Sequence, residues 1–76
     1  MINSLVYAAG FISVTGRVNN FNHTQGYVEI INDEDIYRAF IKKSTIDQIR
    51  NKKSVTLNLP VEKVRLKIGH RYIKLN

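Results

Sequence analysis

The feature that most constrains this chain is the absence of cysteine from a sequence of only 76 residues. A domain of this size buries only about 60% of the surface that its unfolded chain exposes, so small domains commonly need disulfides or a bound metal. No disulfide can form here, and no Cys/His cluster is present that would hold a structural zinc. We therefore expect a single domain over residues 1–76, stabilised by one apolar core, with no metal and no cofactor.

Apolar and polar residues alternate along most of the chain, as they do in half-buried β-strands. The alternation predicts strands over residues 12–19, 27–31, 36–41, 55–59, 64–68 and 71–75. Turn-forming residues separate the first two strands at 22–26, and Gly69-His70 separates the last two. Pro60 is expected to end its strand or to confine it to a sheet edge. The chain is thus predicted to be mostly β.

Two segments of the sequence carry helical signals. Asn32-Asp33-Glu34-Asp35 suits a hairpin turn before a strand, but it also suits the start of a helix capped by Asn32. The β-rich neighbourhood favours the strand. Further on, Ser44-Thr45-Ile46-Asp47 has the form of a capping box, which predicts a short helix from Ser44 to about Asn51. Ile46 and Ile49 would face the core.

The charge is unevenly distributed along the chain. Twelve Lys and Arg stand against six Asp and Glu, a formal net charge of +6. Residues 1–32 hold one cation and one anion, whereas residues 37–76 hold eleven cations and two anions, which is 11 − 2 = +9. This polarity favours a polyanionic partner, and nucleic acid over a membrane because no strongly amphipathic basic helix is present. The alternative is a basic surface that serves only solubility.

The amino-terminal residues 1–11 are too apolar to be left in water. They are expected to form an extra strand that covers a barrel edge, or to act as a dimerisation segment. A homodimer formed through this segment or through a strand edge is predicted. Because no run reaches about 20 apolar residues, no membrane span is expected. Without the pattern of a signal peptide, a cytoplasmic location is expected.

An enzymatic function is not expected. His23 and His70 lie in separate predicted turns without a third ligand, and Asp33-Glu34-Asp35 lacks the ligand spacing of a calcium loop. No nucleophile is accompanied by a base and a residue to orient that base. The sequence therefore indicates a binding protein.

The predicted order of three strands, one short helix and two or three further strands resembles the OB fold, a Greek-key barrel of five strands. Residues 16–22 (Gly-Arg-Val-Asn-Asn-Phe-Asn) look like the opening of a cold-shock domain, and residues 25–30 and 35–40 resemble its two RNA-binding motifs. Glu29 stands where that family has a second aromatic. A rival resemblance, over residues 14–74, is to bacterial translation initiation factor one and related ribosomal-type OB domains. Both imply a five- or six-stranded OB-type barrel that binds nucleic acid.

The candidate site combines aromatic rings with cations. If Val28 and Ile30 face the core, Tyr27 and Tyr37 should lie on the outer face of the sheet, where exposed rings can stack on unpaired bases. Phe40 is the aromatic more in keeping with the core. Cations on the first and last strands would neutralise phosphates. The predicted nucleic-acid-binding residues are Arg17, Phe21, Tyr27, Tyr37, Arg38, Arg65, Lys67, Arg71, Tyr72 and Lys74.

The predicted function is binding of single-stranded DNA or RNA with little sequence preference, because stacking and charge read little of base identity. The alternative is a small protein-interaction adaptor or a translation-factor-like module that docks through an exposed strand edge, or through the apolar segment 5–11. Lys42, Lys43, Lys52 and Lys53 flank the predicted helix and would then mark a docking edge.

Overall fold

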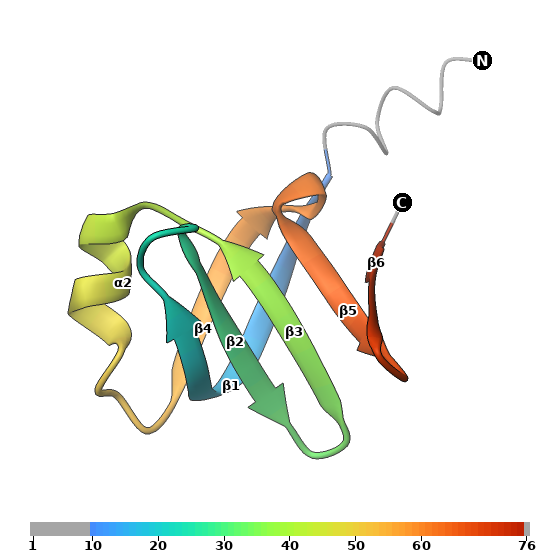
Figure 1. Cartoon of the computed structure of the whole chain (residues 1–76), viewed down its shortest axis with the longest axis horizontal. Coiled ribbons are helices and arrows are strands. Elements are labelled where there is room, and N and C mark those ends of the chain that lie inside the picture. Colours follow the sequence, from blue (N-terminus) through green and yellow to red (C-terminus); the bar gives the residue numbers. More distant parts are fainter. Residues whose placement is uncertain (1–9, 76) are drawn as a thin grey trace.

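The computed structural model describes residues 10–75, and these residues are organised around one antiparallel sheet of six strands (Figure 1). The elements in chain order are β1 (Phe11–Asn22), β2 (Tyr27–Asn32), β3 (Asp35–Phe40), the α-helix α2 (Lys43–Ile49), β4 (Val55–Pro60), the 3-10 helix η1 (Val61–Lys63), β5 (Val64–Ile68) and β6 (Arg71–Lys74). The prediction of a mostly β protein is confirmed. Each predicted strand is present, with its ends shifted by no more than three residues.

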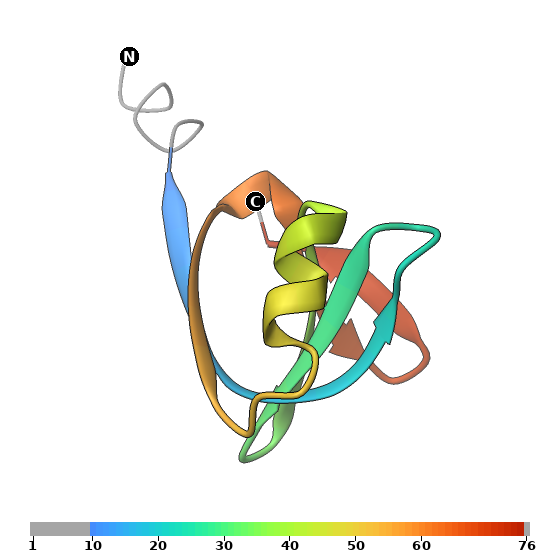
Figure 2. The same ribbon diagram turned by 90° about the vertical axis from the view of Figure 1, so that its left-hand side faces the viewer.

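The strands are hydrogen-bonded in the order β4-β1-β2-β3-β5-β6. Figure 2 shows that the strands curl round and that α2 lies across one end of the curled sheet. Within residues 10–75, β4 and β6 form the two edges of the sheet. The closed OB-type Greek-key barrel therefore stays a prediction.

The β2–β3 hairpin resolves the ambiguous segment in favour of the strand. Asp33 and Glu34 form its turn, and Asp33 takes a φ of 31°. This turn places Asn32 opposite Asp35, so every later pair is set by counting outward from it. Glu29 is thereby opposite Arg38, and Tyr27 is opposite Phe40.

The start of α2 differs from the prediction. The capping residue is Lys42, whose side chain makes no capping hydrogen bond, and Ser44 lies inside the helix. The helix starts early because the chain is held just before it: the Ile41 N–H donates to the Gly26 carbonyl at 3.1 Å, and the Lys42 carbonyl then accepts from the Ile46 N–H at 3.0 Å. Ile46 and Ile49 are buried, as predicted.

The core consists of aliphatic side chains from the inner face of the sheet and from α2. Its buried members are Val14, Val28, Ile30, Ala39, Ile46, Ile49, Val55 and Val64. The close approach of β1 to β2 requires glycine at position 16. A Cβ atom there would lie 2.4 Å from the Ile31 carbonyl oxygen, which is a backbone atom that cannot move aside.

Residues 1–11 are predicted to form an extra strand or a dimerisation segment, and residues 1–9 of that segment lie outside the described residues. Phe11 is the first residue of β1, and the carbonyl of Gly10 accepts a hydrogen bond from the Val61 N–H at 3.1 Å. The homodimer stays a prediction.

Candidate nucleic-acid interface

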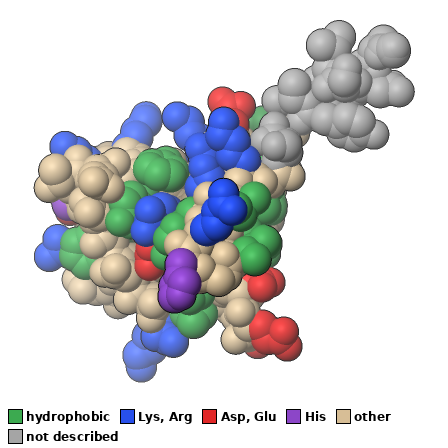
Figure 3. Space-filling view, turned by 45° about the vertical axis from the view of Figure 1, so that its right-hand side comes forward, with side chains coloured by type: hydrophobic (Ala, Val, Ile, Leu, Met, Phe, Trp, Pro, Cys, Tyr) green, Lys and Arg blue, Asp and Glu red, His purple; other side chains and the backbone are tan. Residues whose placement is uncertain are grey.

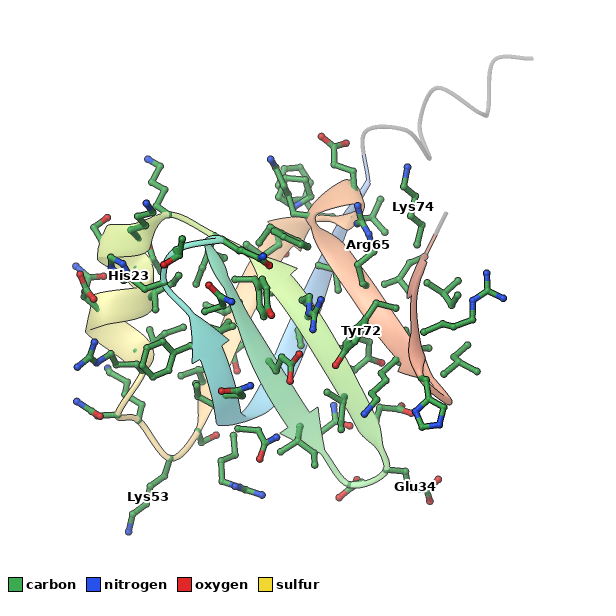
Figure 4. The ribbon with its side chains drawn as sticks, in the orientation of Figure 1. His23, Glu34, Lys53, Arg65, Tyr72 and Lys74 are labelled. Atoms are coloured by element: carbon green, nitrogen blue, oxygen red, sulfur yellow. The ribbon has the colours of Figure 1, made fainter. Side chains whose placement is uncertain are left out.

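The outer face of the sheet, opposite the core, carries most of the predicted binding residues. Side chains that are directly opposite in neighbouring antiparallel strands lie on the same face. The pairs Glu29–Arg38, Arg38–Arg65, Arg65–Lys74 and Lys67–Tyr72 therefore join β2, β3, β5 and β6 on one face. The charged and aromatic residues of this outer face are Arg17, Tyr27, Glu29, Arg38, Phe40, Arg65, Lys67, Tyr72 and Lys74. Figure 4 shows Arg65, Tyr72 and Lys74 on β5 and β6.

At the centre of the outer face, Arg38 forms a partly buried ion pair with Glu29 and lies against two rings. Its Nη2 and Nε donate to Glu29 Oε2 at 2.7 and 3.2 Å, and the Tyr72 hydroxyl donates to the same oxygen at 2.9 Å. The Arg38 guanidinium carbon lies 4.1 Å from the ring centre of Tyr27 and 3.7 Å from that of Tyr72. Tyr27, Glu29, Arg38 and Tyr72 are called the Glu29 cluster below. Each member contacts Arg38, so the cluster acts as one unit.

The Glu29 cluster holds its charges in fixed states. Burial alone would raise the pKa of Glu29, but the hydrogen bonds from Arg38 and Tyr72, together with the charges of Arg38 and Lys67, outweigh it and lower that pKa below 4.5. Burial and the hydrogen bond to Glu29 raise the pKa of Tyr72. Burial disfavours the Arg38 charge, yet the hydrogen bond to Glu29 outweighs it and raises the pKa of Arg38 above its usual value. The carboxylate and the guanidinium thus cancel each other.

Tyr27 lies on the outer face as predicted, but it is not an open platform. Its exposed fraction is only 8%. The Arg38 guanidinium covers the ring, and Phe40 packs edge-to-face against it with ring centres 5.5 Å apart at 65°. A base cannot reach the Tyr27 ring in this arrangement.

The predicted placement of Tyr37 beside Tyr27 is wrong. Tyr37 is opposite Ile30 on β2 and Leu66 on β5, and its ring packs against the core. The turn at Asp33 places Tyr37 opposite Ile30, which faces the core. Tyr27 is three residues before Ile30 on β2, so it lies on the other face, and the two tyrosines are on opposite faces of the hairpin. Tyr37 is therefore half-buried on the core side of the sheet and is not part of the outer face.

Phe21 and Arg71 also lie apart from the outer face. Phe21 is opposite Val28, on the core side, because the register of β1 shifts between Val18 and Asn20. Its ring is 38% exposed and lies 5.1 Å from the guanidinium carbon of Arg50. Arg71 is opposite Ile68, on the face that does not carry Tyr72. Neither residue joins the Glu29 cluster.

Four cations surround the Glu29 cluster on the outer face. Arg65, Lys67 and Lys74 lie on β5 and β6, and Arg17 lies on β1 opposite Ile31. The Arg65 Nη1 donates to the carbonyls of Glu62 and Val64 at 2.7 and 3.2 Å, which fixes its guanidinium 5.7 Å from the Phe40 ring centre. Figure 3 brings β5 and β6 forward and shows Lys and Arg side chains over this side, with acidic side chains chiefly at its margins. The face is therefore positively charged.

Two residues of this face were not among the predicted site residues. Glu29 and Phe40 are the missed members, and both are in direct contact with predicted ones. Counting outward from the Asp33–Glu34 turn would have found them, because it pairs an acid with Arg38 and one ring with another. No comparable signal in the sequence links Tyr72 to Glu29, which precedes it by 43 residues.

No protein family, curated protein or solved structure matches this chain. Among residues 10–75, no three His, Asp or Glu side chains gather closely enough to hold a metal ion. The helix in that range is too short to cross a membrane.

Proposed function

We propose that this protein is a non-catalytic module that binds single-stranded DNA or RNA across the outer face of β2, β3, β5 and β6. One observation carries the proposal: Arg65, Lys67 and Lys74 share a face with a single acid of the described strands, Glu29. The charge of that acid is already neutralised by Arg38, and its carboxylate also accepts a hydrogen bond from Tyr72. The face therefore keeps its positive charge for an external polyanion.

In the proposed mode of binding, phosphate contacts supply most of the energy. The cations around the Glu29 cluster neutralise phosphates. The Glu29 cluster lies between these cations, and its charges are already paired with each other. Among the described rings of the outer face, only the half-buried ones of Phe40 and Tyr72 offer surface to a base. Such contacts read little of base identity, so binding is largely independent of sequence. The proposal includes an OB-type arrangement, in which one side of a small barrel meets the nucleic-acid strand.

A fluorescence anisotropy titration tests the proposal directly. A labelled oligothymidylate, the corresponding oligouridylate and a duplex of equal length are titrated with the full chain at two salt concentrations. We expect the single strands to bind at least about tenfold more tightly than the duplex, because rings contact only unpaired bases. Equal affinities would leave electrostatic attraction without a single-strand preference, and no binding at low salt would refute the function.

A pair of matched variants tests the assignment of the face. Lys67→Ala with Lys74→Ala should flatten the dependence of binding on salt by about 0.7 per lost phosphate contact on a single strand. Arg71→Ala is the control, because Arg71 is also an exposed cation of β6 but lies on the opposite face. If Arg71→Ala reduces the salt dependence of binding as much per removed charge as the double lysine variant does, the binding face is wrongly assigned.

A further inference from the structure

A second surface lies along the edge of β4 and meets the outer face of the sheet at Phe40. A groove of about 880 Å³ runs between β4 and the segment that joins β3 to α2. Five consecutive residues of β4, from Thr56 to Pro60, line one wall. Ile41, Lys42 and Lys43 contribute to the facing wall. The groove therefore follows a strand for nearly its full length.

β4 is an edge strand with unused pairing capacity. Within residues 10–75 it pairs with β1 alone, so one side of its backbone has no strand partner. An edge of this kind is a template for an added strand. Leu57 and Leu59 alternate with the exposed Thr56 and Asn58, and both leucines are only half-buried. An added strand would meet apolar side chains at every second position.

The rim of the groove is strongly basic. Lys42, Lys43 and Lys63 line it and are exposed, and the lining includes no Asp or Glu from the described residues. Within residues 10–75, none of these three lysines forms an ion pair. A ligand that fits must therefore be acidic as well as apolar.

We propose that this groove is a protein-docking site that takes an extended acidic peptide, which adds to β4 as a further strand. Aliphatic side chains of the peptide would contact Leu57, Leu59 and Pro60, and its carboxylates would face the three lysines. The groove is a poorer fit for nucleic acid, because its lining includes one aromatic ring, that of Phe40, whereas single-strand sites rely on several. A row of free backbone groups matches a peptide backbone and has no counterpart in a phosphodiester chain.

The test is a titration of the full ¹⁵N-labelled chain with a blocked synthetic peptide in which Asp alternates with Val. We expect chemical-shift changes confined to Thr56–Leu59 and Lys42–Lys43. The same peptide with alternate amides N-methylated cannot add as a strand, and a peptide in which Lys alternates with Val is repelled, so both should leave these signals unmoved. The absence of any shift at millimolar peptide would overturn the proposal.

Charge-reversal variants sharpen the test without disturbing the core. Lys42→Glu with Lys63→Glu should weaken peptide binding by about tenfold. Lys52→Glu with Lys53→Glu is the matched control, since these exposed lysines carry the same charge and do not line the groove. Equal weakening by both pairs would indicate long-range attraction only and would overturn the assignment of the groove.

Other occupants give distinct results in the same spectra. Movement of the β4 signals by oligothymidylate would assign the groove to nucleic acid. Their dependence on protein concentration would assign it to a second copy, and contacts from Leu5 or Val6 to Leu57 in the free protein would assign it to the chain's own amino terminus. Each of these results overturns the peptide proposal. Because oligothymidylate is expected to move signals of β5 and β6 instead, failure of this proposal is distinguishable from failure of the nucleic-acid function.

Discussion

The β2–β3 hairpin buries side chains on both of its faces, and the two faces are built in different ways. Towards the core, Val28, Ile30 and Ala39 are fully buried and entirely aliphatic. On the outer face, Tyr27 and Glu29 are almost as well buried, at 8% and 7% exposed, but they are held by hydrogen bonds and by contacts with a guanidinium. Burial on the core side is non-directional and needs only the right volume. Burial on the outer side is directional, so each partner depends on the others.

The largest expected loss of stability comes from removing side-chain volume on the core face. Ile30→Ala should lower the free energy of unfolding by roughly 2–5 kcal/mol, because it leaves a cavity among fully buried neighbours. Urea denaturation followed by circular dichroism measures the change. Ile31→Ala, at a half-buried neighbour on the outer side, is the control and should cost less. An equal cost would contradict the contrast between the faces.

The next effect concerns the ion pair of the outer face. Glu29→Ala and Arg38→Ala should each destabilise the protein by roughly 1–3 kcal/mol, because each leaves a partly buried charge without its partner. The double variant should cost clearly less than the sum of the single ones, since the second change removes the group that the first one orphaned. Additive costs in the double-mutant cycle would show that the pair does not act as a unit.

The same pair predicts a dependence of stability on pH. The pKa of Glu29 lies below its usual 4.5 in the folded state, so the folded state binds this proton less readily than the unfolded state does. The stabilisation is complete above the unfolded pKa and is lost as the pH falls through the folded pKa. Urea midpoints measured across the acid range should therefore fall less steeply for Glu29→Gln than for the parent. If the urea midpoints of the parent and of Glu29→Gln fall in parallel with pH, the pKa of Glu29 is not lowered by folding.

The smallest expected loss of stability comes from removing the hydrogen bond that Tyr72 of β6 donates to Glu29. Tyr72→Phe removes one hydrogen bond to Glu29 but keeps the ring over Arg38, so it should cost about 0.5–1.5 kcal/mol. Tyr37→Phe is the matched control, because within residues 10–75 the Tyr37 hydroxyl makes no side-chain hydrogen bond, and it should be nearly neutral. If both changes cost the same, the bond from Tyr72 contributes nothing specific.

The strands and the turn of the β2–β3 hairpin could be predicted from the sequence, whereas part of the candidate site could not. Alternation and turn residues are local signals, so they located β2, β3 and the Asp33–Glu34 turn. The face of a residue depends on register, and assigning Tyr27 and Tyr37 to one face ignored the count from that turn. Phe21 was misplaced for a related reason, because the register shift in β1 leaves no clear mark in the sequence.

The sequence by itself determined a mostly β chain, the apolar set that forms its core, and the concentration of positive charge in residues 37–76, since each depends on residue type or on a period of two along one strand. Only the tertiary structure decided which distant residues meet. Pairing of β5 with β3, and of β6 with β5, brings Tyr72 over Arg38 and turns an expected stacking platform into a closed ion-pair cluster. Within residues 10–75, the same strand order leaves β4 at an edge beside a basic groove. Neighbours in a sheet are chosen by the packing of the whole chain, which no local pattern encodes.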